Sequence, residues 1–263
     1  MEIKAAALYM PEIHVGEPEK NRENLEKVIR KCFDKNPGID IAVAPELANV
    51  GFNLNYLTED KDDKEKNEIL SPLLEMIPGG ETVKLLENLA KKYETHLVCG
   101  IGERDENGLR YNSAVFISPD GFEGVYRQEY HFLGGSSWIT GFGQKDQNHI
   151  YMLKGKTNVG VLICADVTYD GLMIPTSKRS SIIAIVANWY EEENGPEHWR
   201  FDWNIKEAGK KFKIPLVVGN RGKEYLRGNV LEMAHKGYSA ILIIPGKDPI
   251  IKQETIVEFI PVK

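Results

Sequence analysis

The sequence predicts an α/β fold in which helices alternate with short, buried strands. Two hydrophobic patterns lead to this prediction. Along residues 17–33, apolar side chains recur every three or four positions, which indicates a helix with one buried face. Residues 39–44, interrupted only by Asp40, and residues 182–187 are short apolar runs, which are typical of strands buried on both faces. Because the two patterns interleave, we expect a mixed sheet, or two sheets, covered by helices.

The individual elements follow from these patterns in chain order. The first helix ends at Asn36-Pro-Gly, and a second helix is expected over residues 83–93, followed by a strand over 96–102. Residues 112–118 and 125–127 flank the turn Ser118-Pro-Asp-Gly and predict a hairpin. A helix is expected over residues 196–212, and the charged stretch 58–67 is expected to be an exposed loop or helix. Further buried strands are expected at residues 159–164, 182–187, 215–219, 240–244 and 256–260.

The composition is that of an ordinary globular protein. The chain has 263 residues, of which 42% are hydrophobic and 27% charged, and these values exclude intrinsic disorder and a collagen-like structure. The longest apolar run, residues 181–189, is far shorter than the ~20 residues of a membrane-spanning helix. We expect no signal peptide and no membrane association. Since no repeat or Pro/Gly-rich linker divides the chain, residues 1–263 are expected to form one domain.

The charges, cysteines and histidines indicate which partners, location and bound groups to expect. Thirty-nine acidic residues against 33 basic ones leave a net charge of −6, and no basic cluster is present, so we expect no nucleic-acid partner. Three widely spaced cysteines do not form a disulfide framework, which favours a cytoplasmic location. The six histidines lack the close spacing of zinc ligands, so we expect no metal site and no cofactor.

Reactive side chains stand where the predicted strands end, which is the usual place for a site in an α/β fold. Glu46 follows the strand 39–44 and a proline, although on this fragment alone an exposed loop glutamate is the simpler interpretation. Cys164 ends the strand 159–164, where it could be core packing or a nucleophile. Asp166, two residues later, suggests that the chain is leaving the core there. Cys32 and Cys99 fall within apolar patterns and are interpreted as structural.

The order and spacing of several short motifs resemble those of the nitrilase superfamily of carbon–nitrogen hydrolases. The likeness extends from Ile3 to about Pro245. Its motifs are Pro45-Glu46-Leu47, Tyr111-Asn112-Ser113, Ser118-Pro119-Asp120-Gly121, Tyr126-Arg127, residues 160–166 around Cys164, Ala187-Asn188-Trp189, His198-Trp199 and Val218-Gly219-Asn220-Arg221. The resemblance implies a four-layer α-β-β-α sandwich of the nitrilase type and a homodimer or higher homo-oligomer.

In that family a glutamate, a lysine and a cysteine act together on an amide or nitrile. Glu46 and Cys164 match the glutamate and the cysteine, but Gln128 stands at the position of the lysine. Other departures also fall around the site. Tyr130 stands where a histidine is usual, with His131 shifted by one, and residues 132–143 lack the additional glutamate of many members. Residues 169–171, Tyr-Asp-Gly, stand where Phe-Pro-Glu is common.

The resemblance implies a thiol-dependent hydrolase that cleaves a small amide or carbamoyl amine through a cysteine acyl-enzyme. Cys164 would attack the carbonyl carbon, and Glu46 would act as base and acid. The N–H of Ala165 and the amide of Gln128 would bind the oxyanion. Trp189 and Tyr190 could line the substrate pocket. The alternative interpretation is a catalytically impaired member of the same fold that binds a small molecule or serves as a scaffold. These site residues are Glu46, Gln128, Cys164, Ala165, Trp189 and Tyr190.

Overall fold

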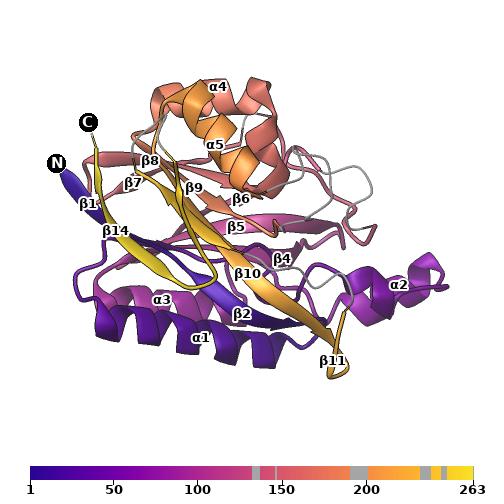
Figure 1. Ribbon diagram of the computed structural model, residues 1–263. Helices are drawn as coiled ribbons and strands as arrows, with labels where there is room; N and C mark the ends of the chain where they lie inside the picture. Colours follow the sequence, from indigo (N-terminus) through magenta and orange to yellow (C-terminus); the bar gives the residue numbers. More distant parts are fainter. Residues whose placement is uncertain (132–136, 146, 190–200, 232–237, 244–247, 263) are drawn as a thin grey trace.

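The computed structural model describes residues 1–131, 137–145, 147–189, 201–231, 238–243 and 248–262, which form four layers (Figure 1). Two β-sheets lie face to face in the middle of the molecule. Helices α1 (Pro18–Lys35) and α3 (Glu81–Tyr93) cover the outer face of one sheet, and α4 (Asp170–Arg179) and α5 (Phe201–Phe212) cover that of the other. The expected α-β-β-α sandwich is confirmed.

The first sheet has six strands in the order β14-β1-β3-β4-β5-β6. Strands β1, β3 and β4 run parallel, and parallel neighbours need long crossover connections, which α1 and α3 provide. Strands β4, β5 and β6 are joined by antiparallel pairing, as the predicted hairpin requires. The strand bounds are β1 Glu2–Ala7, β3 Ile41–Val43, β4 His96–Arg104, β5 Arg110–Ser118, β6 Gly121–Arg127 and β14 Ile256–Pro261.

The second sheet has the main order β13-β12-β10-β9-β8-β7, with β2 and β11 paired to the second half of β10. Strands β8, β9 and β10 are parallel, and α4 and α5 are their crossover helices. The bounds are β2 Tyr9–His14, β7 Ile150–Leu153, β8 Thr157–Ile163, β9 Ile182–Val186, β10 Leu216–Leu226, β11 Asn229–Val230, β12 Ser239–Leu242 and β13 Ile250–Lys252.

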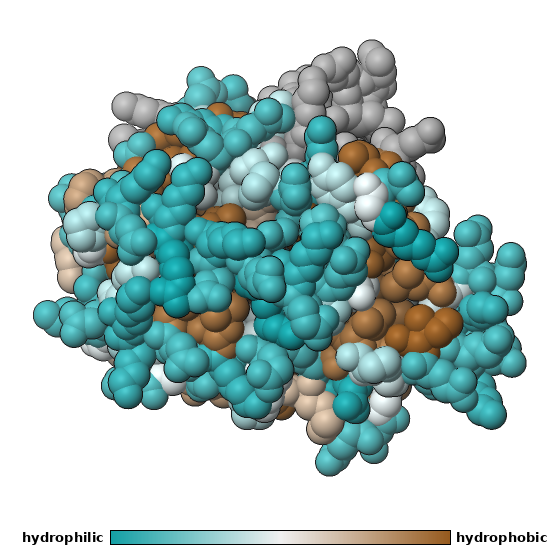
Figure 2. Space-filling model, turned by 90° about the horizontal axis from the view of Figure 1, so that it is seen from below, coloured by the Kyte–Doolittle hydropathy of each residue, from teal (hydrophilic) through white to brown (hydrophobic). Residues whose placement is uncertain are grey.

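Buried apolar side chains fill the spaces between the layers. The largest cluster lies between the two sheets and extends beneath α4 and α5, and a second one fills the space between the first sheet and α1 and α3. A third surrounds the chain after β3 and α2 (Asp63–Leu70). Seen from the side of α1 and α3, the surface is mostly hydrophilic (Figure 2). No helix in the described part of the chain is long and apolar enough to cross a lipid bilayer.

The patterns missed some elements, and the reasons are local. Strand β10 continues seven residues past its predicted end at Gly219, and this second half pairs with β2. Its many polar residues gave no apolar run from which a strand could be predicted. Strands β1, β2, β7, β11 and β13 were not predicted. Helix α4 was also missed, since Gly171 and Pro175 weaken its pattern. The predicted helix 196–212 is described from Phe201 onward, and the last residue of the predicted strand 240–244 lies outside the described residues.

Gly100 in the middle of β4 allows the chain after β3 to lie directly against the sheet. A Cβ atom at this position would be 2.5 Å from the Cα of Glu46 and 2.7 Å from the nitrogen of Leu47. The backbone N–H of Gly100 donates to the carbonyl of Pro45 at 3.0 Å, and its carbonyl accepts from the N–H of Ala48 at 2.9 Å. The position of Glu46 therefore depends on a residue without a side chain at position 100.

We expect Gly100→Ala to displace this segment and to lower the free energy of unfolding by about 1–3 kcal/mol, because the backbone atoms in its way cannot swing aside. Thermal unfolding measures the change. Gly79→Ala is the matched control, since the nearest atom to its Cβ is 4.0 Å away and its melting temperature should stay close to that of the wild type. Equal melting temperatures for the two variants would contradict the close approach.

Candidate active site

Glu46 is a buried carboxylate at the end of β3. Its relative exposure is 1%, so the interpretation of an exposed loop glutamate is wrong. Burial follows from the backbone, because the N–H of Glu46 donates to the carbonyl of Ala187 at 3.3 Å and ties this segment to the opposite sheet. Oε1 of Glu46 accepts a hydrogen bond of 2.6 Å from Nδ2 of Asn112 on β5. Oε2 is buried without a hydrogen-bond partner of standard geometry among the described residues.

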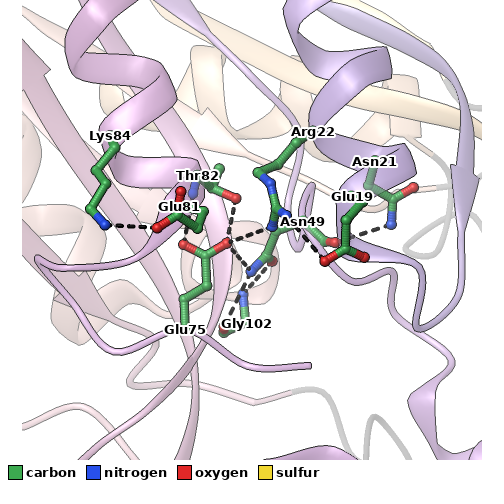
Figure 3. A network of polar contacts seen from close by, with 9 residues as sticks. All are labelled: Glu19, Asn21, Arg22, Asn49, Glu75, Glu81, Thr82, Lys84 and Gly102. Carbon is green, nitrogen blue, oxygen red and sulfur yellow. Dashed lines mark hydrogen bonds and ion pairs between the residues drawn. The ribbon is translucent and has the colours of Figure 1, made fainter. Parts of the chain in front are cut away.

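Asn49 fixes the loop that holds Glu46. Its side chain accepts from the N–H of Gly102 at 2.8 Å and donates to the carbonyl of Gly102 at 3.3 Å, as a neighbouring strand would. Its own carbonyl accepts from the amide of Asn21 on α1 at 3.1 Å. Figure 3 shows that Asn49 also points toward Glu75, whose Oε1 lies 3.5 Å from Nδ2 of Asn49. The loop is thus attached to both a strand and a helix.

Glu75 extends this network to both helices of the outer layer. It accepts from the backbone N–H of Thr82 at 2.9 Å and from the hydroxyl of the same residue. Arg22 on α1 forms an ion pair with Glu75 at 3.7 Å (Figure 3). Because Glu75 is itself buried, these partners are what allow it to remain in the interior. The network anchors the Glu46 loop through contacts that involve neither the Glu46 carboxylate nor Cys164.

Cys164 lies at a sharp turn between β8 and the 3-10 helix η2 (Cys164–Thr168). Its φ angle is +43°, a left-handed conformation that is uncommon for a residue other than glycine. Such strained backbone is found preferentially at functional sites. Cys164 is partly accessible, whereas Cys32 and Cys99 are buried, as their structural interpretation predicts. Burial of its sulfur and the nearby charge of Glu46 raise the pKa of the Cys164 thiol, so the thiol is neutral at rest.

Asp166 holds the Cys164 turn in place from within the core. It is fully buried, so the interpretation that the chain leaves the core here is wrong. Its carboxylate accepts from the N–H of Ile163 at 3.1 Å, from the hydroxyl of Tyr126 at 2.9 Å and from the N–H of Tyr130 at 2.8 Å. Desolvation is the main cause that raises the pKa of Asp166 to about 7. The three donors connect the turn to the end of β6, where Gln128 follows.

Gln128 occupies a fixed place between Glu46 and the turn. Its Oε1 accepts from Nδ2 of Asn112 at 2.9 Å, and its Nε2 donates to the carbonyl of Ile163 at 3.1 Å. Asn112 therefore bridges Glu46 and Gln128 with one amide group. The motif Tyr111-Asn112-Ser113 was visible in the sequence, but nothing in it indicated that Asn112 contacts both residues. This bridge is a feature that the sequence analysis missed.

Arg127, next to Gln128, turns away from the site. Its guanidinium pairs with Glu103 at 2.5 Å and lies 3.9 Å above the ring of Tyr111. Successive residues of a strand point to opposite faces, so this placement follows from the position of Gln128. Arg127 consequently directs its charge toward Glu103 and away from the Cys164 turn.

The site also changes the titration of Glu46 strongly. Burial raises its pKa to about 7 from an ordinary value of 4.5. Four opposing influences keep the rise from being larger: the hydrogen bond from Asn112, the thiol of Cys164, the charge of Arg221 and the N–H of Asn188. Because the thiol influences the carboxylate and the carboxylate influences the thiol, the two groups share one environment.

The remaining predicted site residues are placed as follows. Ala165 is buried at the start of η2, directly after Cys164. Trp189 is buried, and its carbonyl accepts from the side chain of Asn220 at 2.7 Å. Tyr190 lies outside the described residues. The ring nitrogen Nε2 of His131 lies 3.2 Å from the carbonyl of Gln128, so the shifted histidine contacts the glutamine backbone.

Two tyrosine rings pack together near the Cys164 turn. Tyr130 and Tyr169 stack with ring centroids 5.3 Å apart. Within the described ranges, no three side chains of His, Cys, Asp or Glu are grouped to hold a metal ion. Near this turn the thiol of Cys164 lies beside the buried carboxylate of Glu46, and the neutral amide groups of Asn112 and Gln128 are close to both.

Comparisons with known proteins agree with the geometry. The sequence pattern of the carbon–nitrogen hydrolase family matches residues 4–242. A probable nitrilase of Schizosaccharomyces pombe is 25% identical over 243 residues, which cover 86% of this chain and 76% of that protein. A nitrilase of Pyrococcus abyssi is 33% identical over 173 residues, which cover 65% of this chain and 60% of that protein.

The fold is similar to that of a solved structure as well. Nit3 of Saccharomyces cerevisiae, a member of branch 10 of the nitrilase superfamily, superposes with a TM-score of 0.76 at 18% identity, over 98% of this chain and 90% of that chain. The match to the family pattern spans both sheets and includes Glu46, Gln128 and Cys164. The chain therefore belongs to the carbon–nitrogen hydrolase family, within the nitrilase superfamily.

Proposed function

We propose that this protein hydrolyses a small amide or carbamoyl amine through a thioester formed on Cys164. The observation that supports this most directly is the shared environment of the Glu46 carboxylate and the Cys164 thiol at the ends of β3 and β8. These residues are 118 positions apart in the sequence. A nucleophile with an adjacent base is the minimum that acyl transfer from an amide requires.

In the first half of the reaction, ionised Glu46 takes the proton of the Cys164 thiol at Oε2, the oxygen that has no standard hydrogen bond. The sulfur attacks the carbonyl carbon, and the carbonyl oxygen becomes an oxyanion. The N–H of Ala165 binds the oxyanion, together with the second hydrogen on Nε2 of Gln128, whose first hydrogen is given to Ile163. Protonated Glu46 then gives its proton to the leaving nitrogen, and the C–N bond breaks.

In the second half, Glu46 accepts a proton from a water molecule, which attacks the thioester carbonyl. The C–S bond breaks, the proton returns to the sulfur, and the acid product leaves. These reaction steps balance in atoms and electrons without a metal or cofactor.

We also propose that the protein works in the cytoplasm as a homodimer or a higher homo-oligomer, with no nucleic-acid partner.

The first prediction concerns the nucleophile. We expect Cys164→Ala to remove hydrolysis of every amide or carbamoyl amine that the wild type cleaves, and wild-type protein mixed with substrate to gain the mass of one acyl group. Intact-protein mass spectrometry and product assays measure both. Cys32→Ala is the matched control, because that thiol is buried away from the site on α1. Turnover by Cys164→Ala would contradict the proposed thioester.

The second prediction concerns pH. Because Glu46 must be ionised to take the thiol proton and its pKa is raised to about 7, we expect kcat/KM to rise about tenfold per pH unit below 7 and to level off above it. Glu46→Gln should abolish this rise along with most of the activity. A rate that is already constant between pH 5 and about 8 would show that Glu46 has an ordinary pKa or is not the base.

The third prediction tests Gln128 and separates the two candidate functions. We expect Gln128→Leu to lower kcat by on the order of 10²–10³, the typical effect of losing one oxyanion donor. The observation that favours the alternative, an impaired protein that only binds small molecules, is that Gln128 already bonds both Asn112 and Ile163. In that case the wild type would be inactive and Gln128→Lys would create activity.

A further inference from the structure

The site has a neutral amide where the family has a lysine, so its carboxylate needs another source of positive charge. Among the described residues, Arg221 is the cation whose charge acts on Glu46. Its guanidinium is buried, with a side-chain exposure of 5%. Arg221 lies on β10, in the second sheet, whereas Gln128 follows β6 in the first. The two residues therefore reach the site from opposite layers.

The backbone of β10 explains why Arg221 faces Glu46. Gly219, two residues earlier and on the same face of the strand, lies so close to the end of β3 that a Cβ would be 2.2 Å from the carbonyl oxygen of Val43 and 2.6 Å from that of Ala44. The side chain at position 221 is directed to the same side, where the chain continues from Ala44 toward Glu46. Proximity thus follows from strand register, independently of any titration.

Glu224 holds the guanidinium from one end. Its Oε1 lies 3.4 Å from a terminal nitrogen of Arg221, and it is itself buried. The same carboxylate also accepts from the N–H of Phe52 at 2.5 Å and from the side chain of Asn53. Since Glu224 shares its charge among several donors, it neutralises Arg221 only in part. Nε of Arg221 is buried without a hydrogen-bond partner among the described residues.

We propose that Arg221 is the positioning residue that gives Glu46 the positive charge which Gln128 cannot supply, and that Glu224 holds Arg221 in place for this purpose. This inference deepens the proposed function, since it rests on Glu46 acting as the base. Arg221 acts through the carboxylate and touches no reacting atom. The groups that face Glu46 are Asn112 from β5, Cys164 from η2, Asn188 after β9 and Arg221 from β10, with Asp166 behind Cys164.

The test measures the reactivity of the thiol and needs no substrate turnover. The rate of alkylation of Cys164 by iodoacetamide, a neutral reagent, is followed from pH 5 to about 9 by intact mass, with Cys164→Ala as the background from the buried cysteines. In the wild type we expect the rate to inflect near pH 7, where Glu46 ionises and can take the thiol proton. Glu46→Gln should remove this inflection.

The charge of Arg221 then predicts the direction of each shift. Arg221→Gln should move the inflection up by about one pH unit, the usual effect of removing one nearby opposite charge. Arg221→Lys keeps the positive charge, so its inflection should lie close to that of the wild type. Glu224→Gln removes the negative charge that partly neutralises Arg221, so the inflection should move down. Circular dichroism confirms that each variant is folded, and if Arg221→Gln does not fold, the Glu224→Gln shift alone decides.

An inflection that stays in place in Arg221→Gln, or that moves up in Glu224→Gln as well, would overturn the inference, because a merely structural effect does not depend on the sign of the removed charge. The outcome is separate from the test of function. Shifts in the predicted directions without any amide hydrolysis would leave the role of Arg221 standing and would count against the proposed reaction alone.

Discussion

The site depends on the burial of one carboxylate. Moving the pKa of Glu46 from 4.5 to about 7 corresponds to roughly 3 kcal/mol of differential interaction between its two protonation states. Glu46 ionises above pH 4.5 in the unfolded chain but only above about pH 7 in the folded chain. The free energy of unfolding therefore falls by roughly 3 kcal/mol as the pH rises through this window. The rest of the site compensates for this cost.

Three independent attachments keep the carboxylate where it is. The close approach at Gly100 sets the backbone, the Asn49–Glu75 network ties the loop to the outer helices, and Asn112 binds the carboxylate itself. Each attachment comes from a different element, so the position of Glu46 is a property of the whole first sheet and its helices. Cys164 is held in the same manner from the second sheet, through Asp166.

Much of this arrangement could be predicted from the sequence, and the missing parts have physical reasons. The α/β class and most buried strands follow from hydrophobic patterns, because apolar runs between parallel strands are distinctive. The second half of β10 was missed since Arg221 and Glu224 look like surface residues, and only their mutual pairing lets them be buried. Asp166 was misinterpreted for the same reason, because burial of a carboxylate depends on donors that come from distant strands.

The left-handed backbone at Cys164 has a consequence for how the thiol is to be understood. A side chain in this region of conformational space costs roughly 1–2 kcal/mol that glycine would not incur. If the thiol had no role, replacing Cys164 by glycine would stabilise the folded chain. Such a change would remove only the packing of a small, partly accessible side chain. The thiol is thus present against the thermodynamic preference of its own backbone.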